Sequence, residues 1–96
     1  MSKTVWKFYL SPGYANSMPK GAEVLSVRAQ GEDVCLWALV DPAAPHEDRW
    51  FSQYGTGHPI VESDNLKYVG SCHWERTERF QPTSWVVIHV FEDLKP

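Results

Sequence analysis

The stretch AEVLSVRAQGEDVCLWALV, residues 22–40, carries the clearest structural pattern of this chain. In its first half Leu25 and Val27 alternate with Ser26 and Arg28, which is the period of a half-buried strand. The residues Gln-Gly-Glu-Asp then form a turn signal, and VCLWALV continues with little polarity on either face. Two apolar runs on either side of a short glycine-containing turn predict a β-hairpin. The stretch therefore indicates that a β-sheet is the centre of the fold.

Four further segments have the composition of short strands, and they occupy residues 4–10, 49–54, 67–74 and 85–94. The first alternates large apolar side chains with smaller or polar ones, and the last is rich in β-branched residues. Prolines and glycines punctuate residues 11–21, which predicts a loop there.

Helical periodicity is nearly absent from the chain. The best helix candidate is APHEDRW, residues 44–50, which is short and has few apolar positions with which to dock. We therefore predict an all-β fold, mainly antiparallel, with about six strands curled into a small barrel or sandwich and at most one short helical turn.

Length and charge limit the possible classes of protein. Ninety-six residues predict one domain, residues 1–96, near the lower end of what one core can stabilise. A net charge of −3 with scattered lysines and arginines argues against direct binding of DNA or RNA. There is neither an apolar run of about 18 residues nor a leader pattern, so we expect no membrane contact and a cytoplasmic protein. Cys35 and Cys72 are expected to stay reduced there.

A second pattern is the glycine-rich stretch SQYGTGHPIVE, residues 52–62. Its two glycines permit positive φ angles, and successive backbone N–H groups in such a turn can bind an anion. The lysine of a phosphate-binding P-loop and the third glycine of a dinucleotide-binding motif are both missing. Two interpretations stay open, a structural turn at the end of a strand or a ligand contact. The predicted ligand contacts are Tyr54, Gly55, Thr56, Gly57 and His58.

Trp37 and Asp41 are predicted as further neighbours of the ligand. Asp41 directly precedes Pro42 at an expected strand end, so its alternative role is to cap that turn. Trp37 belongs to a large set of aromatic side chains, which either pack in the core or serve at interfaces and stack on bases. Because a small sheet also leaves strand edges to protect, we expect a homo-oligomer.

Metal binding and catalysis have little support in the sequence. Paired spacings such as Cys-x-x-Cys are missing, and Cys72 and His73 would point to opposite faces of a strand. Serines, histidines and aspartates occur without a nucleophile elbow, and His89 lies in an apolar strand where a structural role is usual. We therefore predict no catalytic residue, no metal site and no cofactor, and a protein that is not an enzyme.

Four strings in this order, MPKGAEVLSV, CLWALVDP, YGTGHPI and HVFE, resemble a family of small uncharacterised proteins encoded by tailed bacteriophages and prophages. The resemblance covers about four-fifths of the chain, and the pair CLWALVDP and GTGHPI is its most specific part. The chain departs from it over residues 71–84, where the family has shorter connections. The resemblance implies an accessory protein made in the cytoplasm of an infected host bacterium, but it implies no activity and no catalytic residues.

Residues and resemblance together predict two classes of function. The first is a binding protein that sequesters a small anionic ligand, such as a nucleotide immune signal of the host, with the glycine-rich turn on the phosphates and aromatic rings on the base. The second is an inhibitor of a host protein or a virion accessory protein, which binds its partner through an aromatic patch or an exposed strand edge.

Overall fold

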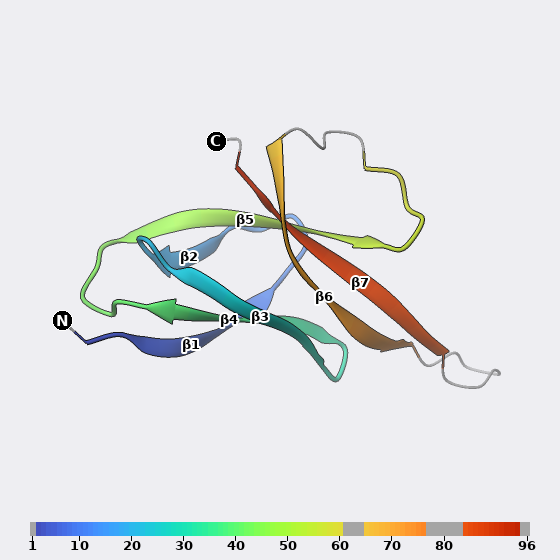
Figure 1. Ribbon diagram of the computed structural model, residues 1–96, viewed down its shortest axis with the longest axis horizontal. Coiled ribbons are helices and arrows are strands. Elements are labelled where there is room, and N and C mark those ends of the chain that lie inside the picture. The colour runs from blue at the N-terminus through green and yellow to red at the C-terminus, as the bar shows by residue number, and fades with distance from the viewer. Residues whose placement is uncertain (1, 61–64, 77–83, 95–96) are drawn as a thin grey trace.

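The computed structural model describes residues 2–60, 65–76 and 84–94 of the chain. Within them the backbone forms seven strands in two antiparallel sheets (Figure 1). One sheet has the order β1-β4-β3 and the other the order β2-β5-β7-β6. The strands are β1 (Thr4–Leu10), β2 (Asn16–Pro19), β3 (Glu23–Gln30), β4 (Asp33–Val40), β5 (His46–Gly55), β6 (Leu66–Arg76) and β7 (Ser84–Asp93).

The hairpin expected from residues 22–40 is present as β3 and β4. Gln30 pairs with Asp33, which leaves Gly31 and Glu32 as a two-residue loop. Gly31 has a φ of 62°, and a positive φ at the first central position is what a type II′ hairpin turn requires. The glycine therefore sets the register of this hairpin, and the prediction is confirmed.

The alternation within β3 is less regular than the sequence suggests. The register of β3 on β4 shifts between Val24 and Ser26, so Leu25 is the extra residue of a β-bulge. Leu25 is 50% exposed, whereas Val27 is buried in the core. A bulge adds one residue to one strand, and it thereby turns the next side chains to the other face.

The predicted loop over residues 11–21 contains a strand, which raises the strand count above the expected six. Strand β2 pairs with β5 from Asn16 opposite Arg49 to Pro19 opposite His46. A proline is tolerated there because β2 is an edge strand.

The segment over residues 44–50, the best helix candidate, is extended from His46 onwards as the first half of β5. Pairing with both β2 and β7 overrides its weak local preference, and no α-helix occurs in the described parts of the chain. None of these parts provides a helix long and apolar enough to cross a membrane.

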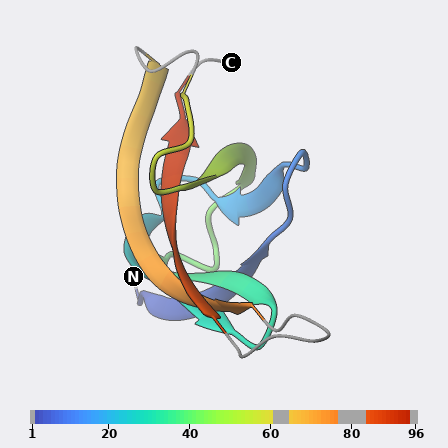
Figure 2. The ribbon, with the colours of Figure 1, turned by 90° about the vertical axis from the view of Figure 1, so that its right-hand side faces the viewer.

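Both sheets bury side chains in one core, so the fold is a sandwich and not a closed barrel. Figure 2 shows β6 and β7 curving side by side along the height of the molecule. A Cβ atom at Gly70 of β6 would lie 3.4 Å from Cγ2 of Val27 on β3, so glycine lets these strands approach closely. The buried apolar cluster comprises Leu10, Met18, Ala22, Val27, Val34, Leu36, Ala38, Val40, Phe51 and Val90.

Candidate functional site

The glycine-rich turn lies at the end of β5 and closes on itself. The His58 N–H donates to the Gly55 carbonyl oxygen at 3.1 Å, and Gly57 has a φ of 86°. A four-residue turn with a positive φ at its third position has the geometry of a type II turn, in which glycine is favoured. The structure thus gives Gly57 a definite conformational role.

The His58 ring folds back over the start of the turn. The Gly55 N–H donates to His58 Nδ1 at 3.3 Å, and a Cβ atom at position 55 would lie 2.9 Å from His58 Cε1. The amides of Gly55 and His58 are therefore both used inside the turn. Of the backbone donors expected to face an anion, those of Thr56 and Gly57 are left for a ligand.

Three cationic side chains that could assist anion binding at this turn lie elsewhere in the structure. Arg49 is held by Glu92 and by the Ala22 carbonyl, and Arg28 lines a shallow hollow on the other sheet. Lys20 follows strand β2, where its N–H donates to the Pro45 carbonyl at 2.7 Å. A phosphate-binding turn usually works together with a cation, and none of these three side chains supplies one here.

His89 joins the turn to the sheet through two hydroxyl groups. Its Nε2 atom lies 2.8 Å from Thr56 Oγ1, and its Nδ1 atom lies 3.1 Å from the Tyr68 hydroxyl. Neutral imidazole has one donor and one acceptor nitrogen, and either hydroxyl can play the complementary role. The ring is half-buried and held between two hydroxyl groups, an arrangement that its apolar sequence context does not reveal.

Around His89 the solvent side of the β5-β7-β6 sheet is aromatic. Phe51 and Val90 are buried, so their neighbours along each strand point to the opposite side of the sheet. There the Phe91 ring packs edge-on against Tyr54 and Tyr68, with centroids 5.8 and 5.2 Å apart. We call this surface the outer aromatic face, formed by Trp50, Tyr54, Tyr68, His89 and Phe91.

The turn also borders a separate hollow on the inner side of the sheet. Gly55, Thr56 and His58 line a space of about 700 Å³ against Trp74 and residues 86–88 of β7. Most of the lining side chains are apolar. The turn therefore lies between two surfaces, the outer aromatic face and this hollow.

Trp37 lies on the other sheet and is not part of this site. It is on β4, where Leu36 and Ala38 on either side of it point into the core. Trp37 lines a shallow hollow of about 420 Å³ with Val5 and Leu25 on the solvent side of the three-stranded sheet. The spacing of the sequence could not show this separation, because it depends on how the two sheets pair.

Asp41 closes the turn that follows β4. Its Oδ1 atom accepts the Ala43 N–H at 3.0 Å, and its carbonyl accepts the Ala44 N–H at 3.0 Å. This is the turn-capping geometry expected of an aspartate before a proline. The contacts supply the structural role that the sequence offered as the alternative to ligand binding.

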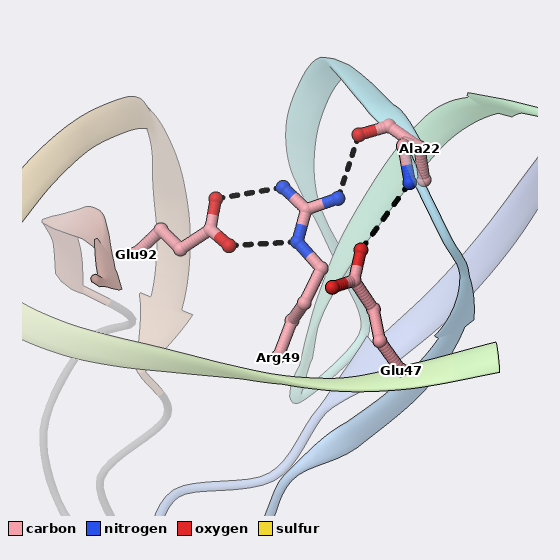
Figure 3. Close-up of polar contacts among 5 residues, drawn as sticks. Ala22, Glu47, Arg49 and Glu92 are labelled. Atoms are coloured by element: carbon pink, nitrogen blue, oxygen red, sulfur yellow. Dashed lines mark hydrogen bonds and ion pairs between the residues drawn. The ribbon is translucent and has the colours of Figure 1, made fainter. Parts of the chain in front are cut away.

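An ion pair that the sequence does not reveal joins β5 to β7 beside the segment that connects β2 to β3. Arg49 Nε and Nη2 each donate to Glu92 at 2.7 Å, and Nη1 donates to the Ala22 carbonyl at 2.6 Å (Figure 3). Beside it, Glu47 accepts the Gly21 N–H at 3.2 Å. The hydrogen bond to Glu92 raises the pKa of Arg49, which keeps the guanidinium charged. We call Arg49 and Glu92 the Arg49 clamp.

Cys35 and Cys72 are free thiols, and burial raises the pKa of both. A raised pKa keeps a thiol protonated and therefore a poor nucleophile. The described residues contain no group of three or more histidine, cysteine, aspartate or glutamate side chains placed to hold a metal ion.

Comparison with known proteins identifies one family. The family described as a domain of unknown function, DUF7352, matches residues 1–96, so the chain belongs to it. Neither the curated proteins nor the solved structures include a match to this chain.

Proposed function

We propose that this member of the DUF7352 family is a binding protein without catalytic activity, and that it holds a small ligand with a planar ring on the outer aromatic face. The supporting observation is that Thr56, His89 and Tyr68 form one hydrogen-bonded chain beside the Phe91 ring. Aromatic rings provide stacking surfaces for a planar group, and the two hydroxyls provide polar contacts at its edge.

A nucleotide is the ligand class that best combines these features. Its base can stack on the exposed Tyr68 and exchange a hydrogen bond with the Thr56 hydroxyl. The backbone N–H groups of Thr56 and Gly57 can donate to a phosphate oxygen. The resemblance to small phage-encoded proteins supports a role in the cytoplasm of an infected bacterium, where the protein would sequester a nucleotide immune signal of the host.

Matched tyrosine variants test the proposal. Tyr68 and Tyr9 are both 53% exposed, but Tyr9 lies on β1 in the other sheet. We expect nucleotides to raise the melting temperature of the native protein and of Y9A, and to raise that of Y68A much less. Y68A should weaken nucleotide affinity by about tenfold, which is the effect expected from losing one base–aromatic stacking contact. If a nucleotide panel leaves the native protein's melting temperature unchanged, the nucleotide proposal is wrong.

The contribution of the phosphate group to affinity can be measured in the same way, by comparing a nucleoside with its nucleotide. Because the turn has few free amides and no cation among the described residues that line it, we expect a nucleoside to retain most of the affinity of its nucleotide. Native mass spectrometry of protein purified from bacteria would report a retained ligand and the proposed homo-oligomer together.

A protein partner on the outer aromatic face is the second candidate. Trp50 extends this face beyond the area that one base covers, and it is 46% exposed. Exposed tryptophan and tyrosine side chains are typical anchors of protein interfaces. A stoichiometric partner retained by the native protein and by Y9A, but lost in Y68A without any effect of nucleotides, would favour this inhibitor or virion accessory function over the first.

A further inference from the structure

The inner side of β6 and β7 is only partly covered by the three-stranded sheet. Val90 is fully buried, but Ile88, Val86 and Trp74 further along are only half-buried. Figure 1 shows that the joined ends of β6 and β7 run past the end of that sheet. At this end the described residues cover these apolar, inward-facing side chains only in part.

Trp74 crosses this open end and divides it. Its Nε1 atom donates to the Glu32 carbonyl at 2.9 Å, which ties the indole to the turn between β3 and β4. On one side is the hollow of about 700 Å³ bordered by the glycine-rich turn. On the other side, a hollow of about 350 Å³ reaches Pro12 and Asp33, and both hollows are lined by Trp74 and Ile88. We call the two hollows together the Trp74 groove.

The two halves of the groove differ in chemistry. The larger half has an apolar floor with the polar groups of Thr56 and His58 at its rim. The smaller half carries the exposed carboxylates of Glu32 and Asp33. Among the described residues that line either half there is no lysine or arginine. The groove therefore attracts a cation at one end, beside an indole that also favours cations, and an apolar group at the other.

We propose that the Trp74 groove binds an extended peptide segment of another protein, with an apolar side chain in the larger half and a lysine or arginine near Glu32 and Asp33. In an extended chain, side chains two residues apart lie on the same side and roughly 7 Å apart. Two such side chains can enter neighbouring hollows on either side of a ridge, which here is Trp74. The groove lies on the opposite side of the sheet from the outer aromatic face and shares only the glycine-rich turn with the proposed nucleotide site, so the proposal does not depend on the proposed function.

A labelled peptide tests the charge preference. The probe is fluorescein-Gly-Leu-Ser-Arg-Gly, its counterpart has glutamate in place of arginine, and binding is followed by fluorescence anisotropy at low salt. We expect the arginine peptide to bind at least about tenfold more tightly than the glutamate peptide, with a preference that weakens as salt screens the carboxylates. Equal binding of the two peptides, or no saturation by the arginine peptide up to about 1 mM, overturns the proposal.

Paired variants locate the site. The double variant E32Q/D33N should weaken the arginine peptide by about threefold to tenfold, because exposed ion pairs contribute modestly. The double variant E23Q/D48N removes the same number of charges from exposed positions outside the groove and should leave binding unchanged. Equal effects of the two double variants would mean that only the net charge of the protein matters, and would contradict peptide binding at the Trp74 groove.

A steric variant tests the apolar half. V86W fills the larger hollow and should abolish peptide binding, whereas V5W on the solvent side of β1 should not. Y68A should keep peptide binding and weaken nucleotide binding, so failure of this proposal and failure of the proposed function give different results. Full peptide binding by a folded V86W protein overturns the proposal.

Discussion

Arg49 illustrates how a single side chain can hold several strands. All three of its guanidinium nitrogens have partners, two on Glu92 and one on the Ala22 carbonyl. The two side chains are 15% and 12% exposed, so they are largely shielded from water. A bidentate pair in such a position has good geometry but leaves a costly unpaired charge if one partner is removed.

We therefore expect E92Q to lower the free energy of unfolding by about 3 kcal/mol, since it leaves the Arg49 cation without its counter-ion. Urea denaturation provides the measurement. K7Q is a suitable control, because Lys7 makes an exposed hydrogen bond to Gln30 and its loss should change the midpoint little. Equal midpoints for E92Q and K7Q would show that the Arg49 clamp does not stabilise the fold.

The two glycines of the turn should respond differently to alanine. Gly57 has a φ of 86° with open space around it, so G57A should cost about 1 kcal/mol through backbone strain alone. G55A should instead displace the His58 ring, because its new Cβ atom would lie 2.9 Å from His58 Cε1.

A double-mutant cycle separates the two causes. Combined with H58A, the cost of G55A should shrink, whereas the cost of G57A should stay the same. The measurement is the free energy of unfolding of each single and double variant. If H58A relieves neither substitution, the packing of the His58 ring over Gly55 is not what selects glycine there.

The raised pKa of the two thiols predicts that the free energy of unfolding declines at alkaline pH. Burial is the main cause that raises the pKa of Cys35 and of Cys72 above the ordinary value of 9.0. The unfolded chain therefore loses these protons first, so their contribution is fully present below pH 9.0 and is lost as pH rises through the folded values.

Urea midpoints at several pH values around and above 9 would measure this decline. In the variant C35A/C72A the decline should be shallower than in the native protein, and iodoacetamide should label the native thiols slowly. Identical pH profiles for the two proteins would contradict the burial of these thiols.

At the scale of elements, β2 shows how pairing partners determine structure. Its four residues end at Pro19 in a stretch rich in proline and glycine, yet Met18 is completely buried because β2 pairs with β5 at the edge of the four-stranded sheet. The neighbouring strand β5 contains the helix candidate of the sequence and is extended for the same reason. In both segments the hydrogen bonds and the buried area come from residues distant in sequence, which local propensity does not count.

Met18 provides a direct test of this element. M18A should cost about 3 kcal/mol of unfolding free energy, as large-to-small changes in a packed core do. L25A removes a similar volume at the half-exposed bulge of β3 and should cost far less. Thermal or urea denaturation would report both values, and similar costs would mean that β2 is not part of the core in solution.

At the scale of the whole molecule, the chain crosses between the sheets repeatedly. β2 follows β1 in sequence but belongs to the other sheet, and β3 and β4 then return to the sheet of β1. The core cluster contains side chains of both sheets, so neither sheet can bury its inner face alone. We therefore expect the two sheets to unfold as one cooperative unit.

Hydrogen exchange tests this cooperativity. The amides of Leu36 on β4 and Val90 on β7 lie at fully buried positions of the two sheets. Both should exchange only through global unfolding and should therefore report the same free energy, within about 0.5 kcal/mol. Clearly different values would show that the sheets unfold separately and would contradict the single domain predicted from the length of the chain.

The turn of the candidate site could be predicted from the sequence, but its partners could not. The glycines at positions 55 and 57 indicate a tight turn, because glycine readily adopts a positive φ such as the one that Gly57 has. The partners of that turn come from β6 and β7, through His89 and Tyr68, and no local pattern identifies them. Residues 71–84, where the sequence departs from the phage proteins that it resembles, lie half outside the described residues, which omit 77–83.

The sequence by itself determined the all-β class, the central hairpin and the glycine-rich turn, because alternation and turn chemistry act between residues close in the chain. Only the tertiary structure decided that β2 is a strand, that Trp37 lies on a different sheet from the turn, and that Arg49 pairs with Glu92. These outcomes depend on which strands pair and which faces meet. Strand pairing and face packing are both set by the surface area buried between segments far apart in sequence. No single segment therefore contains the information that determines them.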